Sequence, residues 1–391
     1  MAMEKGARPV YKKHNSFVEI RHRHEEAFAN ARRRVSALRE DPGRSKSLSV
    51  AHAAILEQVF VDLLDPEDPA SATEPRFGLT PHVVEEIATL SDDQLPRYLA
   101  HRYRYEIFPQ KKITDDYPPY LQIEPTSVCN FRCVFCFETD PTFTNKANGF
   151  MGRMTLDLFK ALVDQAEGHI EFISLASRGE PLLYPDIIPM LAYTRGKFLN
   201  LKMNTNASLL DEAKAHAILS GGVRTLVFSA DAAAEPLYGQ LRVNGKLSVV
   251  MANIERFQKI RQTQYPDTPI ITRVSGVKVS ADQDINAMEA TWGGLADQVA
   301  FVHYNPWENV YNEAVNDVAA PCSDLWRRMF AWWDGKVNPC DVDYKSTLSV
   351  GTFPERTLSG LWTSPRYEAL RDAHLNSSRE TVDPCRRCTV I

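Results

Sequence analysis

Seven cysteines are the residues of this 391-residue chain whose types and spacing most clearly suggest chemistry. Three of them lie in one short C-x3-C-x2-C segment, at Cys129, Cys133 and Cys136. Three thiolates on one loop can ligate one corner of a small iron–sulfur cluster. Three ligands cannot saturate four irons, so one iron would stay open for a small molecule, as at catalytic metal sites. Free buried thiols or an incomplete zinc site are the alternatives for this segment.

The other four cysteines stand near the end of the chain, and the last two form a C-x2-C pair: Cys322, Cys340, Cys385 and Cys388. Four thiolates can ligate one [4Fe–4S] cluster completely and leave no iron open. A four-cysteine zinc site also uses C-x2-C pairs and remains the alternative. Because seven is an odd number and no secretory signal is visible, we expect metal ligation in a reducing cytoplasm rather than a disulfide framework.

The segments that must position these cysteines change character near residue 120. From there, short apolar runs alternate with helical stretches, which predicts strand–helix units with a parallel sheet. The expected strands are 120–124, 171–175, 199–204, 225–229, 270–279 and 298–303, and the expected helices are 155–167, 186–193, 210–220, 246–264 and 284–292. Right-handed crossovers could curl such a sheet into a full or partial barrel, with functional groups at the carboxyl ends of the strands.

The regions on either side of this alternating pattern differ from it. The first 115 residues are predicted to be mainly helical, with helical stretches at 16–41, 51–64 and 81–90. Thr80 is a plausible N-cap, with proline at the first helical position. This region is expected to be a packing or lid layer, or a module that recruits substrate. After about residue 305 the pattern ends, and one late helix is expected at 364–375.

Composition and charge restrict the class of protein. Hydrophobic residues make up 44% of the chain and charged residues 24%, as in soluble globular proteins. The formal net charge of −5 argues against nucleic acid as the main partner. Uninterrupted apolar runs are too short to span a bilayer. We therefore expect a cytoplasmic protein with neither a nucleic-acid nor a membrane partner.

The C-x3-C-x2-C segment, with Phe135 before its last cysteine, resembles the signature of the radical S-adenosylmethionine (SAM) superfamily. The resemblance implies a [4Fe–4S] cluster whose open iron binds the amino and carboxylate groups of SAM. It implies reductive cleavage to methionine and a 5′-deoxyadenosyl radical, which abstracts hydrogen from a substrate. It also implies an α/β fold built on a partial (β/α)6, TIM-like barrel, and a flavodoxin or ferredoxin as electron donor.

Further segments resemble the SAM-binding motifs of that superfamily in chain order. Arg178-Gly179-Glu180-Pro181 is similar to its Gly-Gly-Glu-Pro segment, which implies that Glu180 receives the SAM ammonium group; Arg178 replaces the first glycine. Ser229 ends the fourth strand and is a candidate for the ribose hydroxyls, whereas Arg273 on the fifth is a candidate for the SAM carboxylate. The complete set of expected SAM contacts is Phe135, Gly179, Glu180, Asn204, Asn206, Ser229 and Arg273.

The last four cysteines, with Gly335 five residues before Cys340, resemble the auxiliary-cluster domain of SPASM/twitch radical SAM enzymes in its shortened, one-cluster form. Their spacing resembles that of the aminocyclitol dehydrogenase of butirosin biosynthesis. The implied cofactors are two [4Fe–4S] clusters and SAM. The expected domains are a helical N-terminal extension at 1–115, the radical SAM partial barrel at 116–305 and a small twitch domain at 306–391.

A saturated auxiliary cluster is well suited to accept one electron. The expected reaction is therefore the dehydrogenation of an alcohol carbon in a small-molecule substrate, namely a sugar, an aminocyclitol or a related natural product. A radical SAM peptide maturase, a redox-neutral epimerase or dehydratase, and a non-enzymatic metal-stabilised binding protein are the alternatives. The polar residues after Cys340 supply the candidates for a catalytic base, Asp343, Tyr344 and Lys345, with Asp341 beside them.

Overall fold

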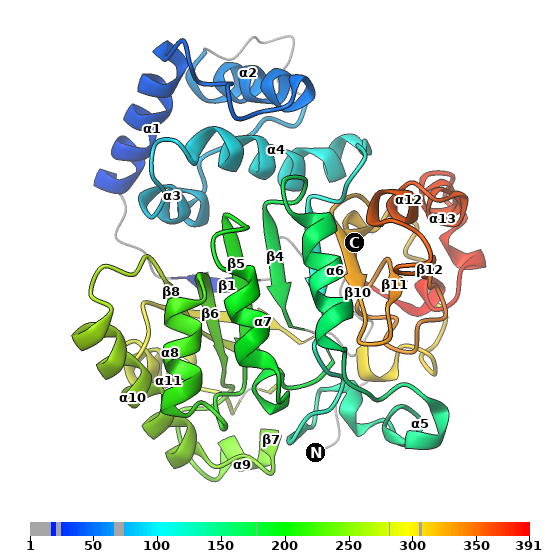
Figure 1. Ribbon diagram of the computed structural model, residues 1–391. Helices are drawn as coiled ribbons and strands as arrows, with labels where there is room; N and C mark the ends of the chain where they lie inside the picture. Colours follow the sequence, from blue (N-terminus) through cyan, green and yellow to red (C-terminus); the bar gives the residue numbers. More distant parts are fainter. Residues whose placement is uncertain (1–16, 21–24, 66–73, 177, 281, 305–306) are drawn as a thin grey trace.

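The computed structural model describes residues 17–20, 25–65, 74–176, 178–280, 282–304 and 307–391. Its core is one ten-stranded sheet in the order β1-β9-β8-β6-β5-β4-β2-β10-β11-β12 (Figure 1). The strands of this sheet are β1 (Phe17–Ile20), β2 (Tyr120–Ile123), β4 (Phe172–Leu175), β5 (Asn200–Thr205), β6 (Val223–Ser229), β8 (Ile271–Lys278), β9 (Gln298–His303), β10 (Arg328–Ala331), β11 (Lys336–Asn338) and β12 (Gly351–Thr352).

The six expected strands are β2, β4, β5, β6, β8 and β9, and neighbouring members of this set pair in parallel. The helices that connect and flank them are α6 (Leu156–Ala166), α7 (Ile187–Thr194), α8 (Glu212–Ser220), α9 (Leu237–Leu241), α10 (Leu247–Gln264) and α11 (Ile285–Trp292). Every residue of β2 and β4 is buried, as expected for parallel strands covered on both faces. The prediction of a partial (β/α)6 barrel is confirmed.

Short polar side chains begin several of these helices, which explains why their starts could be read from the sequence. Thr155 caps α6 by accepting a hydrogen bond from the Leu158 amide, at 3.2 Å, and Asp211 and Asp284 cap α8 and α11 in the same way. Thr80 accepts a hydrogen bond from the Val83 amide, so the N-cap predicted for the 81–90 helix is confirmed.

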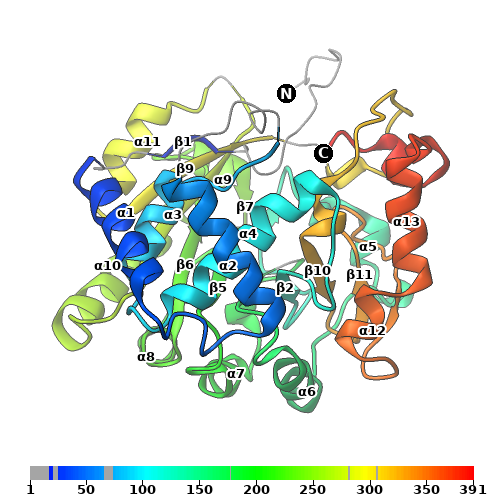
Figure 2. The same ribbon diagram turned by 90° about the horizontal axis from the view of Figure 1, so that it is seen from above.

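Four helices of the N-terminal region form a layer over the amino ends of the strands: α1 (Glu25–Glu40), α2 (Val50–Leu64), α3 (Pro81–Ala88) and α4 (Leu95–Lys111). The His101 ring of α4 stacks on Phe172, the first residue of β4, with ring centroids 3.9 Å apart. Arg97 forms a two-pronged ion pair with Glu171, at 2.6 and 2.8 Å. Figure 2 shows these helices lying across the ends of the strands. The layer therefore closes the end of the barrel opposite to the strand termini that lead into the cysteine segment.

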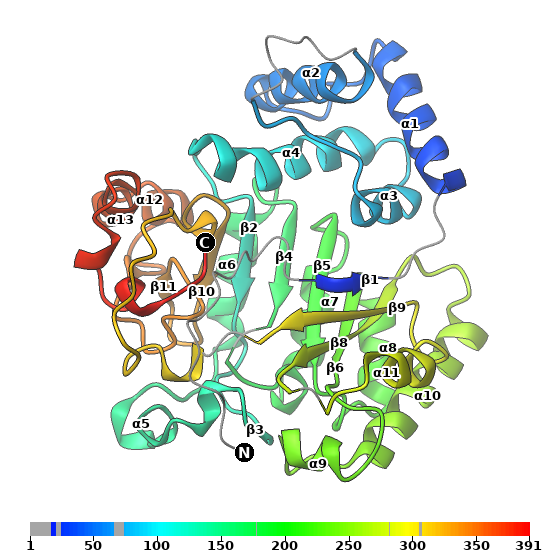
Figure 3. The same cartoon turned by 180° about the vertical axis from the view of Figure 1, so that it is seen from behind.

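The expectation of a single helical stretch over 16–41 is wrong in its first part. Phe17–Ile20 is the strand β1, which pairs antiparallel with β9 at the edge of the sheet (Figure 3). Its register places Phe17 opposite Val302 and Ile20 opposite Ala300. The helix α1 begins only at Glu25. A four-residue strand depends on a distant partner for its hydrogen bonds, so local periodicity could not reveal it.

The C-terminal region continues the sheet instead of forming a separate layer. Strand β10 lies parallel to β2, with Arg328 opposite Tyr120 and Ala331 opposite Ile123. The hairpin of β10 and β11 turns at Gly335, whose φ is +83° and where a Cβ would lie 2.3 Å from the Phe353 carbonyl oxygen. The helices of this region are α12 (Leu358–Trp362) and α13 (Pro365–Leu375), the latter at the place predicted for the late helix. Within the described ranges, no helix has both the length and the apolar character needed to cross a membrane.

Candidate functional site

The first three cysteines lie on the loop that leaves the carboxyl end of β2. Cys133 belongs to the two-residue strand β3 (Arg132–Cys133), which pairs antiparallel with β7 (Arg242–Val243). The Phe131 amide donates a hydrogen bond to the Cys129 Sγ at 3.4 Å, and the Arg242 Nη1 donates one to the Cys133 Sγ at 3.8 Å. Donors aimed at sulfur favour the thiolate form, which is the form that ligates iron.

Burial dominates the ionisation of these thiols. It raises the pKa of Cys129 to about 12, and it also raises the pKa of Cys133 and of Cys136. Neighbouring thiols raise the pKa of Cys129 and of Cys136 further, whereas Arg242 partly offsets the effect of burial on the pKa of Cys133. Without a cation the thiols would therefore stay protonated near neutral pH. Binding of iron would displace their protons, as is usual for cysteine ligands.

Arg242 is held beside Cys133 by a buried ion pair. Its Nε lies 2.5 Å from the Asp231 Oδ2, and Asp231 in turn accepts a hydrogen bond from the Val277 amide at 2.7 Å. Asp231 follows β6, so the pair ties the cysteine loop to the carboxyl ends of β6 and β8. The contact of Arg242 with a cysteine was missed by the sequence analysis, because 109 residues separate it from Cys133 along the chain.

The Arg-Gly-Glu-Pro segment packs directly on the entry to the cysteine loop. A Cβ at Gly179 would lie 2.4 Å from the Thr126 carbonyl oxygen and 2.6 Å from that of Val128, so only glycine fits this approach. The Glu180 amide donates a hydrogen bond to the Val128 carbonyl at 3.0 Å. The close contact explains why glycine stands at this position, and it places Glu180 at the same edge as the cysteines.

The Glu180 carboxylate is buried and already accepts three hydrogen bonds. They come from the Leu182 amide at 3.0 Å, the Thr205 hydroxyl at 2.7 Å and the Asn206 amide at 2.7 Å. Burial raises the pKa of Glu180, and these donors lower it. A carboxylate has about four acceptor positions. One therefore remains for a further donor, so Glu180 is both a structural anchor of β5 and a candidate ligand for an ammonium group.

The structure brings most of the other expected SAM contacts to this edge. The Asn206 Nδ2 donates to the Asn130 side chain within the cysteine loop, at 3.0 Å. Ser229 lies half-buried at the carboxyl end of β6. The Phe135 ring lies under Arg242, with the guanidinium carbon 5.8 Å from its centroid. Their roles towards SAM stay predictions.

Arg273 is not brought to this edge. It is the third residue of β8 and lies near the amino end of that strand. Its Nε donates to the Gln298 Oε1 at 2.6 Å, and its Nη2 lies 3.3 Å from the His82 Nδ1 of α3. This placement speaks against the predicted contact with the SAM carboxylate. The sequence pattern located Arg273 on the correct strand but could not tell which end of the barrel it would reach.

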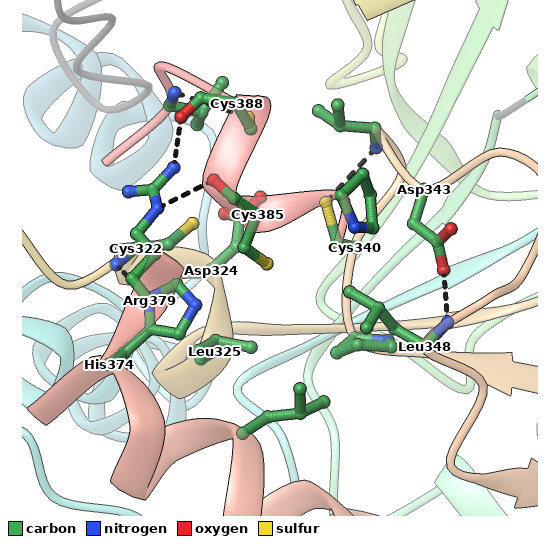
Figure 4. Close-up of a pocket in the computed structure, with 15 residues that line it drawn as sticks. Cys322, Asp324, Leu325, Cys340, Asp343, Leu348, His374, Arg379, Cys385 and Cys388 are labelled. Carbon is green, nitrogen blue, oxygen red and sulfur yellow. Dashed lines mark hydrogen bonds between the residues drawn. The ribbon is translucent and has the colours of Figure 1, made fainter. Parts of the chain in front are cut away.

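The last four cysteines come from three separate chain segments and line one cavity of about 30 Å³ (Figure 4). The cavity is otherwise mainly apolar, with Leu325, Val342, Leu348 and Leu370 among its walls. Arg379 fixes the C-x2-C turn by donating to the carbonyl oxygens of Cys385 at 3.1 Å and Cys388 at 2.5 Å. Across the described ranges, no three His, Cys, Asp or Glu side chains are grouped as closely as a single metal ion requires.

Backbone amides point at two of these four sulfurs. The Val342 amide donates to the Cys340 Sγ at 3.2 Å, and the Val390 amide donates to the Cys388 Sγ at 3.4 Å. Burial raises the pKa of Cys322 to about 11 and also raises the pKa of Cys385. A set of four thiols in an apolar pocket, with amide donors directed at sulfur, fits an iron–sulfur cluster held entirely by protein ligands.

The three candidate bases after Cys340 serve the packing of the C-terminal region. Asp343 is fully buried and accepts hydrogen bonds from the Tyr311 hydroxyl at 2.6 Å and from the Leu348 amide at 2.8 Å. Both the Tyr344 hydroxyl and the Lys345 ammonium contact Asp140, at 2.9 and 2.7 Å. None of the three lines the polar cavity in the interior of the barrel, whereas Asp341 does.

The interior of the barrel holds a polar cavity of about 160 Å³. Its walls come from β2, β4, β5, β10 and the segments around both cysteine groups: Tyr120, Gln122, Phe137, Ser174, Ala176, Lys202, Asn204, Trp307, Arg328 and Asp341. The Asn204 Oδ1 is buried and has no hydrogen-bond partner among the described residues. Lys202 and Arg328 were missed by the sequence analysis. The sequence did contain a signal for Lys202. Lys202 and Asn204 are polar and stand on either side of the buried Met203 in one strand, so both side chains lie on the face opposite to Met203.

Two family models match the chain, and they cover the two cysteine groups. Residues 123–285 match the radical SAM superfamily, and residues 322–389 match the SPASM iron–sulfur cluster-binding domain. The chain therefore contains a radical SAM domain followed by a SPASM domain. Together these domains imply SAM and iron–sulfur clusters as the cofactors.

Several known proteins and solved structures are similar to this chain at low sequence identity. The "tungsten-containing aldehyde ferredoxin oxidoreductase cofactor-modifying protein" of Pyrococcus furiosus is 23% identical over 64% of this chain and 83% of its own. The structure of Streptococcus suis SuiB bound to precursor peptide SuiA is similar with a TM-score of 0.50, at 15% identity over 87% of this chain and 83% of that one. The structure of BtrN in complex with AdoMet and 2-DOIA is similar with a TM-score of 0.49, at 16% identity over 71% of this chain and 94% of that one. The SuiB likeness shows the fold.

Proposed function

We propose that this radical SAM protein, with its C-terminal SPASM domain, dehydrogenates an alcohol carbon of a sugar, an aminocyclitol or a related small molecule. One observation carries the proposal. The four C-terminal cysteines line a single cavity, and four thiolates saturate a [4Fe–4S] cluster. A cluster without an open iron is suited to electron transfer rather than to binding substrate, and an oxidation needs such an acceptor.

The chain's own residues divide the work of this reaction. Cys129, Cys133 and Cys136 would hold the SAM-binding cluster, and Glu180 would receive the SAM ammonium group through its remaining acceptor position. When bound, the cluster and SAM supply a 5′-deoxyadenosyl radical that takes one hydrogen atom from the substrate carbon. The barrel cavity would hold the substrate beside the cysteine loop, because Phe137, the residue after Cys136, lines it.

Removal of the first hydrogen makes the neighbouring hydroxyl more acidic, so the site needs a group that accepts its proton. Asp341 lines the barrel cavity from the C-terminal region and immediately follows the cluster cysteine Cys340. We assign the proton to its carboxylate, since among Asp341, Asp343, Tyr344 and Lys345 only Asp341 lines this cavity. A cluster held by Cys322, Cys340, Cys385 and Cys388 would supply the acceptor for the remaining electron. The substrate thus loses a hydrogen atom, a proton and an electron, which equals two hydrogens.

The product mass tests this reaction. Anaerobic turnover of a substrate deuterated at the carbinol carbon is expected to give a product lighter by that deuterium and one hydrogen. One methionine and one deuterated 5′-deoxyadenosine should form per turnover, and mass spectrometry measures all three. A product of unchanged hydrogen count that carries one solvent-derived hydrogen would instead establish an epimerase.

Replacement of Glu180 tests the SAM assignment. Glu180→Gln keeps one oxygen, which can still accept from the Leu182 amide and the Thr205 hydroxyl, but it loses the negative charge and the oxygen that accepts from the Asn206 amide. Because a hydrogen bond to a charged group contributes about 1.5–3 kcal/mol, SAM affinity should fall about tenfold or more while both clusters remain. Equilibrium binding of SAM measures the affinity, and iron content serves as the control. Unchanged SAM affinity would show that the likeness of this segment is accidental.

The peptide-maturase alternative depended on the N-terminal region as a site that holds a peptide. The described part of that region, α1 to α4, packs on the amino ends of the strands. The cysteine loop leaves the carboxyl end of β2, on the other side of the barrel. This placement favours a packing role and supports the small-molecule proposal.

A further inference from the structure

The end of the barrel cavity farthest from the cysteine loop carries an excess of positive charge. Lys202 on β5 and Arg328 on β10 line the cavity there, and Tyr120, the first residue of β2, lies with them. Tyr120 and Arg328 are the first residues of their strands, and Lys202, the third residue of β5, interacts electrostatically with Glu86 of α3. All three therefore lie towards the layer of α1 to α4. We call these three residues the cavity floor.

The Lys202 ammonium forms no hydrogen bond or ion pair with any residue that the structure describes. The charged groups that affect it most are the guanidinium groups of Arg273 and Arg328, both of which repel it, and the carboxylate of Glu86, which attracts it. Burial, followed by these two guanidinium groups, lowers the pKa of Lys202 to about 7. The ammonium therefore lies in a cavity whose local charges do not neutralise it.

The acidic groups in this region already have partners. The Glu86 carboxylate lies 3.0 Å from the His82 Nε2 and accepts a hydrogen bond from the Tyr98 hydroxyl at 2.7 Å. Arg328 donates to the Tyr105 hydroxyl at 3.1 Å through its Nε, and its nearest carboxylate, Asp324, is 3.9 Å away. An arginine has five N–H donors, so Arg328 can still donate into the cavity.

Buried charges in proteins are normally paired with an opposite charge or with a ligand, because an uncompensated one is costly. We propose that the cavity floor binds an anionic group of the substrate, a carboxylate or a phosphate, through Lys202 and Arg328. The inference rests on the proposed function, because it orients the substrate. Its anion would lie at the floor, and its oxidised carbon would lie towards Phe137 and Asp341 at the opposite end. The substrate would then be an anionic alcohol, such as a sugar acid or a sugar phosphate.

The proposed anion binding by the cavity floor can be tested with three six-carbon compounds that differ in charge: D-glucose, D-gluconate and D-glucose 6-phosphate. Isothermal titration of the reconstituted protein should show at least one of the two anions binding about tenfold or more tighter than glucose, as charge-assisted hydrogen bonds require. Preference for gluconate assigns a carboxylate, and preference for the phosphate ester assigns a phosphate. Equal affinity for glucose and both anions would overturn the proposal.

Two variants at Lys202 separate charge from shape. Lys202→Met should reduce anion affinity to the level of glucose, whereas Lys202→Arg should retain most of it. Lys202→Met should also raise the melting temperature, because it removes a buried charge without breaking an ion pair. A folded Lys202→Met protein with unchanged anion affinity would refute the role of Lys202.

The wild-type protein offers an independent test that needs no variant. Gluconate stays ionised at neutral pH, whereas Lys202 should lose its proton as pH rises through about 7. The affinity of the protein for gluconate should therefore fall between about pH 6 and about pH 8.5, whereas its affinity for glucose should stay the same. The charged groups that act on Lys202 are Arg273, Arg328 and Glu86, and Tyr120 and Asp341 line the same cavity. Burial raises the pKa of Tyr120 to about 12, outside this window. A gluconate affinity independent of pH would contradict the proposal. These experiments measure binding without turnover. A negative result in the dehydrogenation test would therefore not affect the conclusion about anion binding.

Discussion

Replacing Cys385 and Cys388 by alanine is expected to abolish the oxidised product while SAM cleavage continues. The two substitutions remove half of the thiols around the C-terminal cavity, which the other walls cannot replace because they are mainly apolar. Iron content should fall from about eight to about four per chain, since each [4Fe–4S] cluster holds four. The substrate radical would then form but would have no acceptor for its electron.

Iron and sulfide analysis, together with separate measurement of 5′-deoxyadenosine and product, checks this expectation. The matched control replaces Cys129, Cys133 and Cys136 by alanine. That variant should keep about four irons in the C-terminal cluster yet lose SAM cleavage entirely. Undiminished oxidised product in the Cys385/Cys388 variant would refute the electron-acceptor role. Four irons and one zinc in the intact protein would refute the second cluster itself.

Replacing Arg178 by methionine is expected to destabilise the protein strongly. Arg178 forms a buried two-pronged ion pair with Glu124, with both nitrogen–oxygen distances at 2.6 Å. It also donates to the Tyr344 carbonyl at 2.7 Å, and its guanidinium lies 4.3 Å from the Trp332 ring centroid. Removing one partner leaves the other charge buried without compensation, which costs about 3–5 kcal/mol.

The measurement is the free energy of unfolding in urea, or the shift in melting temperature if unfolding proceeds in more than one step. The double variant Glu124→Gln/Arg178→Met is the matched control. It removes the stranded carboxylate and should recover part of the lost stability, whereas two independent sites would add their losses. A loss below about 1 kcal/mol in the single variant would show that the pair contributes little.

The ion pair also explains the departure from the superfamily pattern at this position. Glu124 follows β2, Arg178 follows β4, and Tyr344 belongs to the C-terminal region. Arg178 therefore connects the barrel to the domain that holds the second set of cysteines. The sequence by itself shows only that arginine replaces glycine here, because the partners of Arg178 at positions 124 and 344 are adjacent to it in space and not in the chain.

The sequence by itself determined the two cysteine groups and the order of the barrel strands. Both are local properties. Ligand spacing such as C-x3-C-x2-C lies within one loop, and each parallel strand of the barrel is a short run of its own. The strands β2, β4, β5, β6, β8 and β9 could therefore be located without knowledge of their neighbours. The helix starts at Thr80 and Thr155 were equally readable, because an N-cap bonds an amide three residues away.

Only the tertiary structure decided which side chains meet across the chain. It placed β10 beside β2, moved Arg273 away from the cysteine edge, and put Lys202 and Arg328 at one cavity floor. It also turned residues 17–20 into an edge strand of the sheet. These contacts join residues far apart in sequence, and their energies depend on burial and on the sum of nearby charges. Burial and the sum of nearby charges are set only when the barrel has folded around these residues. No local sequence pattern could therefore predict these contacts.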